Sequence, residues 1–367
     1  MDTLVDYIQW MGDFSLSTVP FRDADMLVLC ALSYVDYSPI FDGKQGEVYL
    51  KDCKAMIQAD QVEITVAGDV TGFQKILELA ANSRRFGELR MSDYVEPLRN
   101  DPPLQFSAVC FHGPRGLSFL VYRGTDSTLA GWKEDFMISF SRTEAQEHAL
   151  RYAEEHITPD RRWILGGHSK GGNLAFYAAC LLHKEKWQAV KHVYLLDGPG
   201  FDPEGMDSKY IKRIDARTTR IIPRFSIVGM LFEPQLSDSR IVLSSASGFS
   251  QHSLSTWGID HGKLALAEEN DPISRRINTA IAGWIESIPI GNRMTLVNDL
   301  FDSLAATGAD RLDELDDKGL AGLVASLHTL RASNEITKTA LSDLLRRLLA
   351  EGLSLAHFHH RERNGDT

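Results

Sequence analysis

The sequence predicts an α/β protein in which a mainly parallel sheet is covered by helices, with an N-terminal α+β segment and a C-terminal helical extension. Three observations support this fold class. Short apolar, β-rich segments alternate with helical ones between residues 106 and 243, which is typical of parallel strands joined by helical crossovers. A glycine-flanked serine directly follows one of these strands. The 367 residues, 43% of them hydrophobic, suffice for one large core plus an appendage.

The first part of the chain, residues 1–103, is expected to form an N-terminal segment packed on the core. From Asp23 to Tyr37, acidic residues precede apolar residues at helical spacing, which predicts a half-buried helix. A short strand over Val62–Val66 and a helix over Phe73–Ala81 are expected to follow. The segment ends where prolines interrupt the chain, at Pro97, Pro102 and Pro103.

Residues 104–269 are expected to form the core. Two β-rich segments, Phe106–His112 and Leu117–Arg123, are joined by a Gly- and Pro-containing turn, which predicts a hairpin. A helix over Glu144–His156 leads to the apolar run Trp163–Leu165. Further strands are expected over 192–196, 219–222 and 240–243.

The sequence changes character after about Asn270, and residues 270–367 are expected to form the C-terminal helical extension. Apolar residues recur there at helical intervals, at Leu320, Leu323, Val324, Leu327, Leu330, Leu341, Leu344, Leu345 and Leu348. This pattern favours helices packed on their own core, and the alternative is a lid or a surface for a protein partner. The histidines of the tail 357–360 have no matching ligand cluster before them, so we expect a solvated tail and no metal.

Charge and composition exclude several classes of function. The 50 acidic and 39 basic residues give a formal net charge of −11, and no basic run is long enough to follow a phosphate backbone, so nucleic acid is not expected as a partner. The acidic N-terminus lacks the order of a signal peptide and no apolar stretch has membrane-spanning length, so we expect a cytoplasmic protein. Four cysteines, far apart in apolar stretches, predict reduced core thiols. No cofactor is expected.

A serine stands between two glycines in Gly167-His168-Ser169-Lys170-Gly171, after an apolar run and before a helix-forming stretch. This is the layout of a nucleophile elbow, a strand-to-helix turn so tight that its flanking positions must lack a Cβ atom. Free backbone N–H groups at the start of the helix favour developing negative charge. We therefore predict Ser169 as a nucleophile, and the alternative is a Gly-rich turn that only packs a helix on a sheet.

A serine hydroxyl is a poor nucleophile at neutral pH unless a base takes its proton. In proteins with such an elbow, the acid and then the histidine follow the serine along the chain. His252 fits this order, because it lies in a loop after the strand that ends at Leu243. His261 stands nearer the C-terminal helices, and His183 and His192 come too early. The alternative is a surface histidine bonded to a neighbouring hydroxyl.

The acid that orients the imidazole must lie on a loop at the carboxyl edge of the sheet, between the serine and the histidine. Asp197 satisfies this, because it begins the Asp-Gly-Pro-Gly turn that leaves the strand 192–196. Asp238 and Glu233 are the alternatives, and spacing alone decides little among the three. Asp197 could equally cap its own turn.

A site for acyl transfer also needs donors for the oxyanion of the tetrahedral intermediate. One is the N–H of the residue after the nucleophile, here Lys170. A second is expected from the loop Arg123-Gly124-Thr125-Asp126 after an earlier strand, where Thr125 offers an N–H and a hydroxyl. This loop is also compatible with a turn that caps a helix around Gly131–Phe136.

The elbow, the 123–126 loop and the 197–200 turn together resemble the Mbeg-like family, a domain of unknown function among the class 3 lipase-like α/β-hydrolases. Similar blocks follow in the same order over nearly the whole chain, at 4–7, 32–36, 131–136, 168–173, 226–231 and 251–252. The resemblance implies an α/β-hydrolase fold with Ser169 as nucleophile, His252 as base and Thr125 as the oxyanion-loop residue.

Two positions depart from the class 3 lipase pattern. Those lipases carry the triad aspartate on the strand before the histidine strand, where this chain has Ser226. Because a serine cannot stabilise imidazolium as a carboxylate does, either Asp197 supplies the acid from the preceding strand or the triad is incomplete. The second departure is Lys170, in place of an apolar residue. A cation there favours an anionic acyl substrate or pairs with Glu134 or Asp135, and we expect the pair.

These features predict a serine hydrolase that cleaves a carboxylic ester or lipid-like small molecule through an acyl-enzyme on Ser169. Acyl transfer and peptide hydrolysis would use the same residues. The alternative is a catalytically inactive hydrolase-like scaffold that binds a ligand, or a protein partner through its C-terminal helices, because a fold does not guarantee a function.

Overall fold

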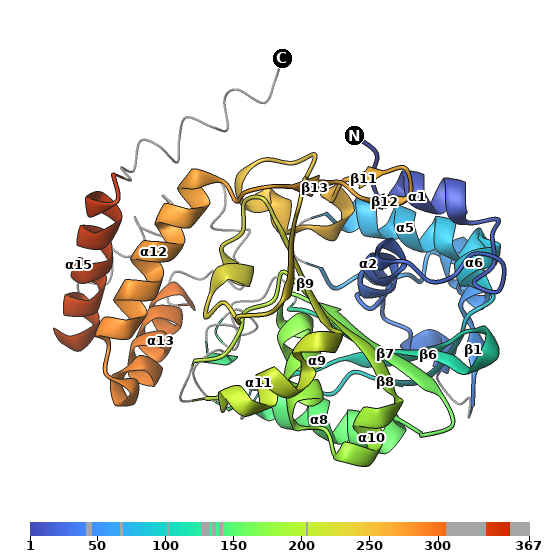
Figure 1. Cartoon of the computed structure of the whole chain (residues 1–367), viewed down its shortest axis with the longest axis horizontal. Coiled ribbons are helices and arrows are strands. Elements are labelled where there is room, and N and C mark those ends of the chain that lie inside the picture. The colour runs from blue at the N-terminus through green and yellow to red at the C-terminus, as the bar shows by residue number, and fades with distance from the viewer. Residues whose placement is uncertain are drawn as a thin grey trace.

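The computed structural model describes residues 1–41, 46–66, 69–100, 103–125, 133, 137–138, 142–202, 205–305 and 335–352. Within these ranges, a sheet occupies the centre of the molecule (Figure 1). It has nine strands in the order β1-β2-β5-β6-β7-β8-β9-β10-β13. Its strands are β1 (Val48–Tyr49), β2 (Arg90–Val95), β5 (Ala108–His112), β6 (Leu117–Tyr122), β7 (Arg162–His168), β8 (Val190–Leu196), β9 (Thr218–Pro223), β10 (Asp238–Val242) and β13 (Leu266–Ala267).

The middle of this sheet is parallel and its borders are antiparallel. Strands β6 to β10 run in one direction, whereas β1, β2, β5 and β13 are each antiparallel to their neighbours. Gly167 pairs with Tyr122 on one side and Leu195 on the other, so β6, β7 and β8 end at the same edge. The sheet is therefore α/β-hydrolase-like and mixed, with the parallel strands that the sequence predicts in its middle and the expected hairpin between β5 and β6.

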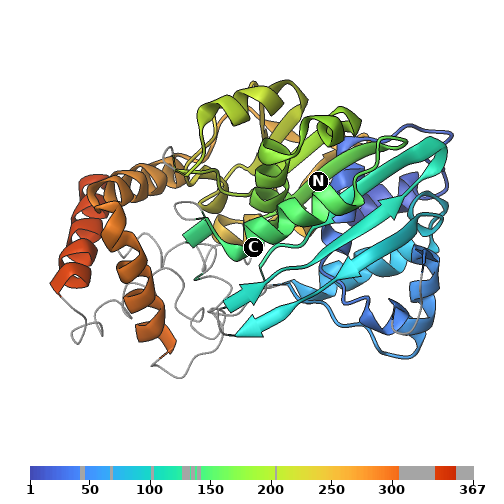
Figure 2. The same cartoon turned by 90° about the horizontal axis from the view of Figure 1, so that it is seen from below.

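The two faces of the sheet bury separate apolar layers. Because side chains alternate along a strand, β6 directs Phe119 and Val121 to one face and Leu120 and Tyr122 to the other. The first face is covered by α1 (Leu4–Met11), α2 (Asp23–Leu32) and α5 (Val70–Asn82). The second is covered by α8 (Glu144–His156), α9 (Lys170–Leu181), α10 (Lys184–Ala189) and α11 (Ser208–Ile214) (Figure 2).

Local sequence explains where the covering helices begin. Helix α8 has the expected bounds, and Thr143 and Gln146 form a reciprocal capping box at its start. Helix α5 starts three residues earlier than expected, because the Asp69 carboxylate accepts the Gly72 N–H as its cap.

The remaining elements are short. The smaller helices are α3 (Ser38–Phe41), α4 (Cys53–Gln58) and α6 (Arg84–Gly87). One hairpin joins β3 (Leu98–Asn100) with β4 (Pro103–Gln105), and another joins β11 (Ile259–Asp260) with β12 (Lys263–Leu264).

The N-terminal segment differs from expectation in three respects. The helix expected over Asp23–Tyr37 ends at Leu32, and it is buried from Ala24 onward, not half-buried. The strand expected over Val62–Val66 is wrong: Ile64 forms only an isolated bridge with Val35. Val35 lies in the turn after α2 and not in a strand, so the single bridge does not extend into a ladder of paired residues. The segment also adds β1 and β2 to the sheet, beyond packing on it.

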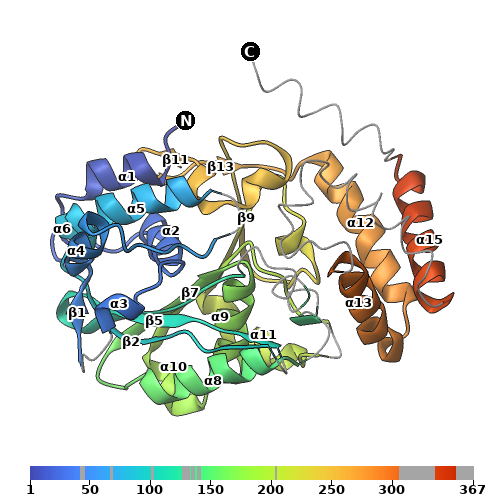
Figure 3. The same cartoon turned by 180° about the vertical axis from the view of Figure 1, so that it is seen from behind.

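Three helices of the C-terminal extension, α12 (Pro272–Ser287), α13 (Ile290–Ala305) and α15 (Glu335–Ala350), lie together at the end of the molecule away from α6 and β1 (Figure 3). They pack on one another and on the segment after β9. Phe225 joins an apolar cluster with Ile277 and Leu348, and Leu231 packs against a second cluster that includes Trp284. The leucines at 341–348 fall on α15, whereas those at 320–330 lie outside the described residues.

The cysteines confirm the expectation of core thiols. Cys30, Cys53, Cys110 and Cys180 are all free and buried. Burial raises the pKa of the Cys53 and Cys110 thiols to about 12, so neither is a reactive thiolate near neutral pH. In the part of the chain that the structure describes, no helix combines the length and apolar character needed to cross a membrane.

Candidate active site

Ser169 occupies a sharp turn between β7 and α9. Its backbone has φ 57° and ψ −127°, a strained conformation for a residue with a side chain. The Ser169 N–H donates to the Leu196 carbonyl at 2.9 Å, which ties the turn to the end of β8. A Cβ atom at Gly167 would overlap the backbone of Gly171, and one at Gly171 would overlap the Tyr122 carbonyl. Both flanking glycines are therefore required by close backbone approach.

Asp197 and His252 meet at the same edge of the sheet. Asp197 is the first residue after β8, has φ 41° and is 1% exposed. His252 ends the 3₁₀ helix η5 (Gly248–His252), and its Nδ1 lies 2.6 Å from Asp197 Oδ2. Since an ionised carboxylate only accepts hydrogen bonds, Nδ1 carries the proton and Nε2 of the neutral ring keeps its lone pair. His252 thus has the tautomer that a general base requires.

His168 fixes the backbone of His252 beside the elbow. The two imidazole rings lie 4.5 Å apart between centroids. His168 Nε2 lies 2.9 Å from the His252 carbonyl, which can only accept, so Nε2 is the protonated nitrogen. Nδ1 then accepts from the Tyr34 hydroxyl at 2.9 Å. Burial, reinforced by the electrostatic effect of the neighbouring His252, holds the pKa of His168 well below its usual range. His168 is therefore neutral with both nitrogens engaged, and it is not a second base.

The Thr125 loop lies against the elbow. Thr125 is buried, and the preceding Gly124 approaches so closely that a Cβ atom there would overlap the Tyr34 hydroxyl and the His168 carbonyl. Lys170 begins α9, so its N–H belongs to the first turn of the helix, whose N–H groups have no acceptor within the helix. The structure thus brings both expected oxyanion-loop residues to the elbow, next to the positive end of the α9 dipole.

The Lys170 side chain is buried and points away from solvent. Its Nζ donates to the Gln105 carbonyl at 2.9 Å and lies 3.2 Å from Gln105 Oε1. Glu134 and Asp135, the acids expected to pair with it, lie outside the described residues. The contacts with Gln105 anchor the ammonium group near β4.

The structure does not bring the alternative acids to His252. Asp238 begins β10, where it contacts Arg240 and Thr219 at 2.7 Å. Asp238 pairs with Thr219, which in turn pairs with Tyr194 of β8. Asp197 lies three residues beyond Tyr194, so Asp238 is about 10 Å short of Asp197 along the strand direction. Glu233 forms an ion pair with Arg220 at 2.9 Å. Of the other histidines considered, His261 is exposed on the β11–β12 turn, His192 lies within β8 and His183 directly precedes α10.

Sequence reasoning identified Ser226 only as a serine in place of an aspartate, and missed what it contacts. Its Oγ donates to Asp197 Oδ1 at 2.5 Å, so the carboxylate accepts one hydrogen bond from the imidazole and one from this hydroxyl. Arg220 was also missed. It is buried in β9 close enough to interact with the Asp197 charge. Neither residue carries a motif, and both are separated from Asp197 by more than twenty positions.

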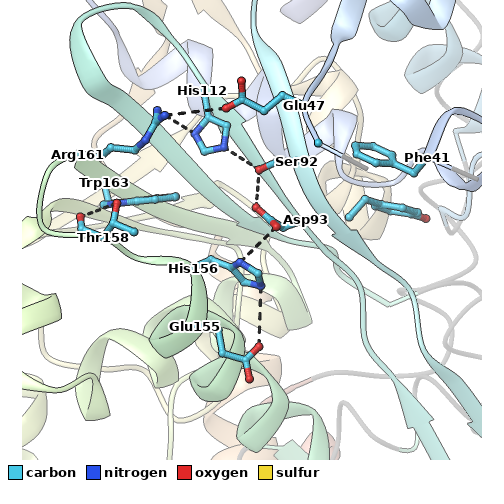
Figure 4. Close-up of a pocket in the computed structure, with 12 residues that line it drawn as sticks. Phe41, Glu47, Ser92, Asp93, His112, Glu155, His156, Thr158, Arg161 and Trp163 are labelled. Carbon is cyan, nitrogen blue, oxygen red and sulfur yellow. Dashed lines mark hydrogen bonds and ion pairs between the residues drawn. The ribbon is translucent and has the colours of Figure 1, made fainter. Parts of the chain in front are cut away.

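A separate cavity of about 610 Å³ lies at the opposite edge of the sheet (Figure 4). It adjoins Trp163 at the start of β7, about 17 Å along the strand from His168. Here Ser92 Oγ donates its single proton to Asp93 Oδ2 at 2.5 Å, so His112 Nε2, at 2.7 Å, must donate to Ser92. Burial lowers the pKa of His112 to about 4. The proton on Nε2 prevents His112 from activating Ser92, so this cluster is not a second nucleophile and base.

The described residues contain no group of three or more His, Cys, Asp or Glu side chains that could hold a metal ion. The elbow presents a serine hydroxyl at a helix N-terminus, close to an imidazole oriented by a buried carboxylate.

The sheet and the elbow between β7 and α9 define a protein with an α/β-hydrolase-like fold. The sequence model of the Mbeg1-like family matches residues 80–302, more than half of the chain, so the chain belongs to this family and the resemblance is confirmed. No curated protein sequence matches the chain.

Three solved structures are similar to the chain at low identity. M37 lipase has 16% identity and a TM-score of 0.35, over 57% of this chain and 70% of the lipase. A Rhizomucor miehei lipase propeptide complex has 15% identity and a TM-score of 0.35, over 60% and 66%. A fungal lipase–inhibitor complex has 14% identity and a TM-score of 0.34, over 66% and 84%.

Proposed function

We propose that the protein is a serine hydrolase that cleaves a carboxylic ester or lipid-like substrate through an acyl-enzyme on Ser169. His252 is the general base and Asp197 the acid that orients it. The Lys170 N–H and Thr125 bind the oxyanion. The observation that supports this most directly is the 2.6 Å bond from His252 Nδ1 to Asp197, because it leaves Nε2 able to accept a proton beside the elbow.

In the first half of the reaction, Ser169 Oγ bonds to the ester carbonyl carbon while its proton moves to His252 Nε2. The carbonyl oxygen takes the electron pair and becomes the oxyanion, stabilised by backbone donors at the start of α9. The imidazolium then protonates the leaving alkoxide as the carbon–oxygen bond breaks. In the second half, water repeats the attack on the acyl-enzyme, releases the carboxylic acid and restores Ser169.

A fluorophosphonate probe tests this proposal, because it phosphonylates only an activated serine. The native protein should be labelled, and Ser169→Ala should lose all labelling. Ser245→Ala is the matched control, since Ser245 is exposed on the loop after β10 and should leave labelling unchanged. A folded native protein that is not labelled would refute the proposal and favour the inactive scaffold.

Hydrolysis of esters of graded acyl length and of anionic or neutral acyl groups would then identify the substrate class. Preference for an anionic acyl group would indicate that a cationic side chain contacts the substrate.

A further inference from the structure

Helix α12 of the C-terminal extension binds the backbone of Ser226. Ser274 Oγ accepts the Ser226 N–H at 3.1 Å and donates to the Ser226 carbonyl at 2.5 Å. Asn278 Nδ2 donates to the same carbonyl at 2.8 Å. Ser274 and Asn278 lie one helical turn apart, so they project from one face of α12. All three side chains are buried, so this contact is a buried clamp on the backbone of a single residue, on its N–H and its carbonyl, and not a surface interaction.

The clamped residue in turn contacts the carboxylate of Asp197. The Gly229 N–H donates to Ser226 Oγ at 3.1 Å, which directs the hydroxyl proton of Ser226 toward Asp197 Oδ1. A Cβ atom at Gly229 would overlap that carboxylate oxygen, so the segment after β9 is packed directly on it. A continuous set of hydrogen bonds therefore runs from α12 through Ser226 and Asp197 to His252.

The extension has two more anchors near the same loops. The Asp271 N–H donates to the Arg224 carbonyl at 2.7 Å, and the Asp271 side chain caps the start of α12. In α13, Arg293 donates to Asp202 at 2.6 Å in a buried ion pair. Asp202 lies five residues after Asp197 on the same loop. The packing of Phe225 on Ile277 adds apolar burial between these polar anchors.

We propose that α12 is part of the catalytic apparatus, with Ser274 and Asn278 as positioning residues that hold the Ser226 hydroxyl on Asp197. The catalytic role of α12 rests on the proposed function, whereas the coupling between α12 and Asp197 rests on the hydrogen bonds alone. It assigns the C-terminal extension a role in the chemistry of the core, beyond that of a cap.

The Ser226 hydroxyl affects the charge on His252 through Asp197. Among the described residues, His168 from the elbow faces His252, and Arg220 from β9 faces Asp197. A donor to a carboxylate disperses its negative charge and favours its ionised form. Without the Ser226 hydroxyl, Asp197 would hold the imidazolium form of His252 more strongly. Loss of the clamp should therefore raise the pKa of His252.

NMR titration of the imidazole measures this effect without requiring activity. The protein has 12 histidines, so His252 is assigned by its absence in His252→Asn. Ser226→Ala should raise the pKa of His252 by about 0.5 to 1 unit, a fraction of the about 1 to 2 units that a hydrogen bond to a charged group represents. Ser274→Ala and Asn278→Ala should shift it in the same direction by less. If Ser274→Ala does not fold, Asn278→Ala still removes one bond to Ser226.

The double variant Ser226→Ala/Ser274→Ala separates positioning from general stability. If Ser274 acts through Ser226, the double variant should have the same pKa for His252 as Ser226→Ala alone. Thr279→Ala is the matched control, because its exposed hydroxyl donates to the Arg275 carbonyl within α12, and it should not shift the pKa.

An unchanged pKa in Ser226→Ala, or in both Ser274→Ala and Asn278→Ala, overturns the proposal. Labelling of the same preparations with fluorophosphonate decides the proposed function separately. Shifts in His252 without labelling would refute the hydrolase while supporting the coupling of α12 to Asp197. Labelling without shifts would support the hydrolase and refute the coupling.

Discussion

Replacement of Asp197 by asparagine tests the site most directly. The change preserves the shape of a side chain that is 1% exposed and removes its charge. In the structure, Ser226 donates to Oδ1 and His252 donates to Oδ2. The amide introduced by Asp197→Asn is a donor on one side and an acceptor on the other, so it cannot accept a hydrogen bond from both partners.

The Ser226 hydroxyl decides which partner keeps its bond. Because the Gly229 N–H already donates to Ser226 Oγ, the hydroxyl continues to donate, and the amide oxygen turns toward it. The amide NH₂ then faces His252 Nδ1, which must give up its proton and accept. The proton of the neutral ring moves to Nε2, the nitrogen that the proposed mechanism needs free.

The loss of charge gives a minimum for the effect. Two unit charges about 4 Å apart, at an effective dielectric constant of about 20, attract each other by about 4 kcal/mol. Removal of this stabilisation from the imidazolium in the transition state lowers kcat by about 10³-fold. The wrong tautomer adds to this, so the expected fall in kcat is about 10³- to 10⁴-fold with little change in KM.

Initial rates of hydrolysis of a p-nitrophenyl ester measure the effect, with circular dichroism to confirm that the variant is folded. Asp238→Asn is the matched control, because Asp238 contacts Arg240 and Thr219 and not His252. It should retain kcat within about threefold. A folded Asp197→Asn protein with at least a tenth of the native kcat would refute the assignment of the acid, and the reverse ranking of the two variants would move it to Asp238.

Two further predictions concern buried imidazoles. Tyr34→Phe removes the hydroxyl that donates to His168 Nδ1. It should lower the free energy of unfolding by about 1 to 3 kcal/mol, because a buried acceptor loses its partner. Urea denaturation at pH 7 measures this change, and an unchanged free energy of unfolding would contradict the hydrogen bond. Burial lowers the pKa of His112 to about 4, so its imidazole stays neutral in the folded state between pH 6.5 and 4, whereas the unfolded state binds a proton there. The free energy of unfolding should therefore decrease as the pH falls from 6.5 toward 4. Between pH 7 and pH 5, the free energy of unfolding of His112→Gln should decrease by about 2 kcal/mol less than that of the native protein. Equal decreases in the two proteins would show that His112 does not titrate in this way.

The sequence by itself determined the features that depend on neighbours along the chain. Gly167 and Gly171 predicted the elbow because close backbone approach excludes a Cβ atom on either side of Ser169. Thr143 and Gln146 sit where α8 begins, since a helix cap is satisfied within one turn. The alternation of apolar runs with helical segments predicted the parallel sheet, because strands buried on both faces must be apolar throughout.

Only the tertiary structure decided which carboxylate meets His252. Asp197, Glu233 and Asp238 all lie between the serine and the histidine, and their order along the chain does not separate them. The register of β8, β9 and β10 does, because it places Asp197 at the carboxyl edge and Asp238 about three residues behind it. A hydrogen bond requires its atoms within about 3 Å, and strand pairing fixes distances on that scale between residues far apart in sequence.

The contacts of Ser226 and His168 were hidden for the same reason. Ser226 meets Ser274 of α12, and His168 meets Tyr34 after α2, across separations of 48 and 134 residues. Neither pair has a periodicity or a motif, because each depends on how a helix docks on the sheet. The sequence determined the types of group near the elbow, and the packing of helices from both ends of the chain determined which of them touch.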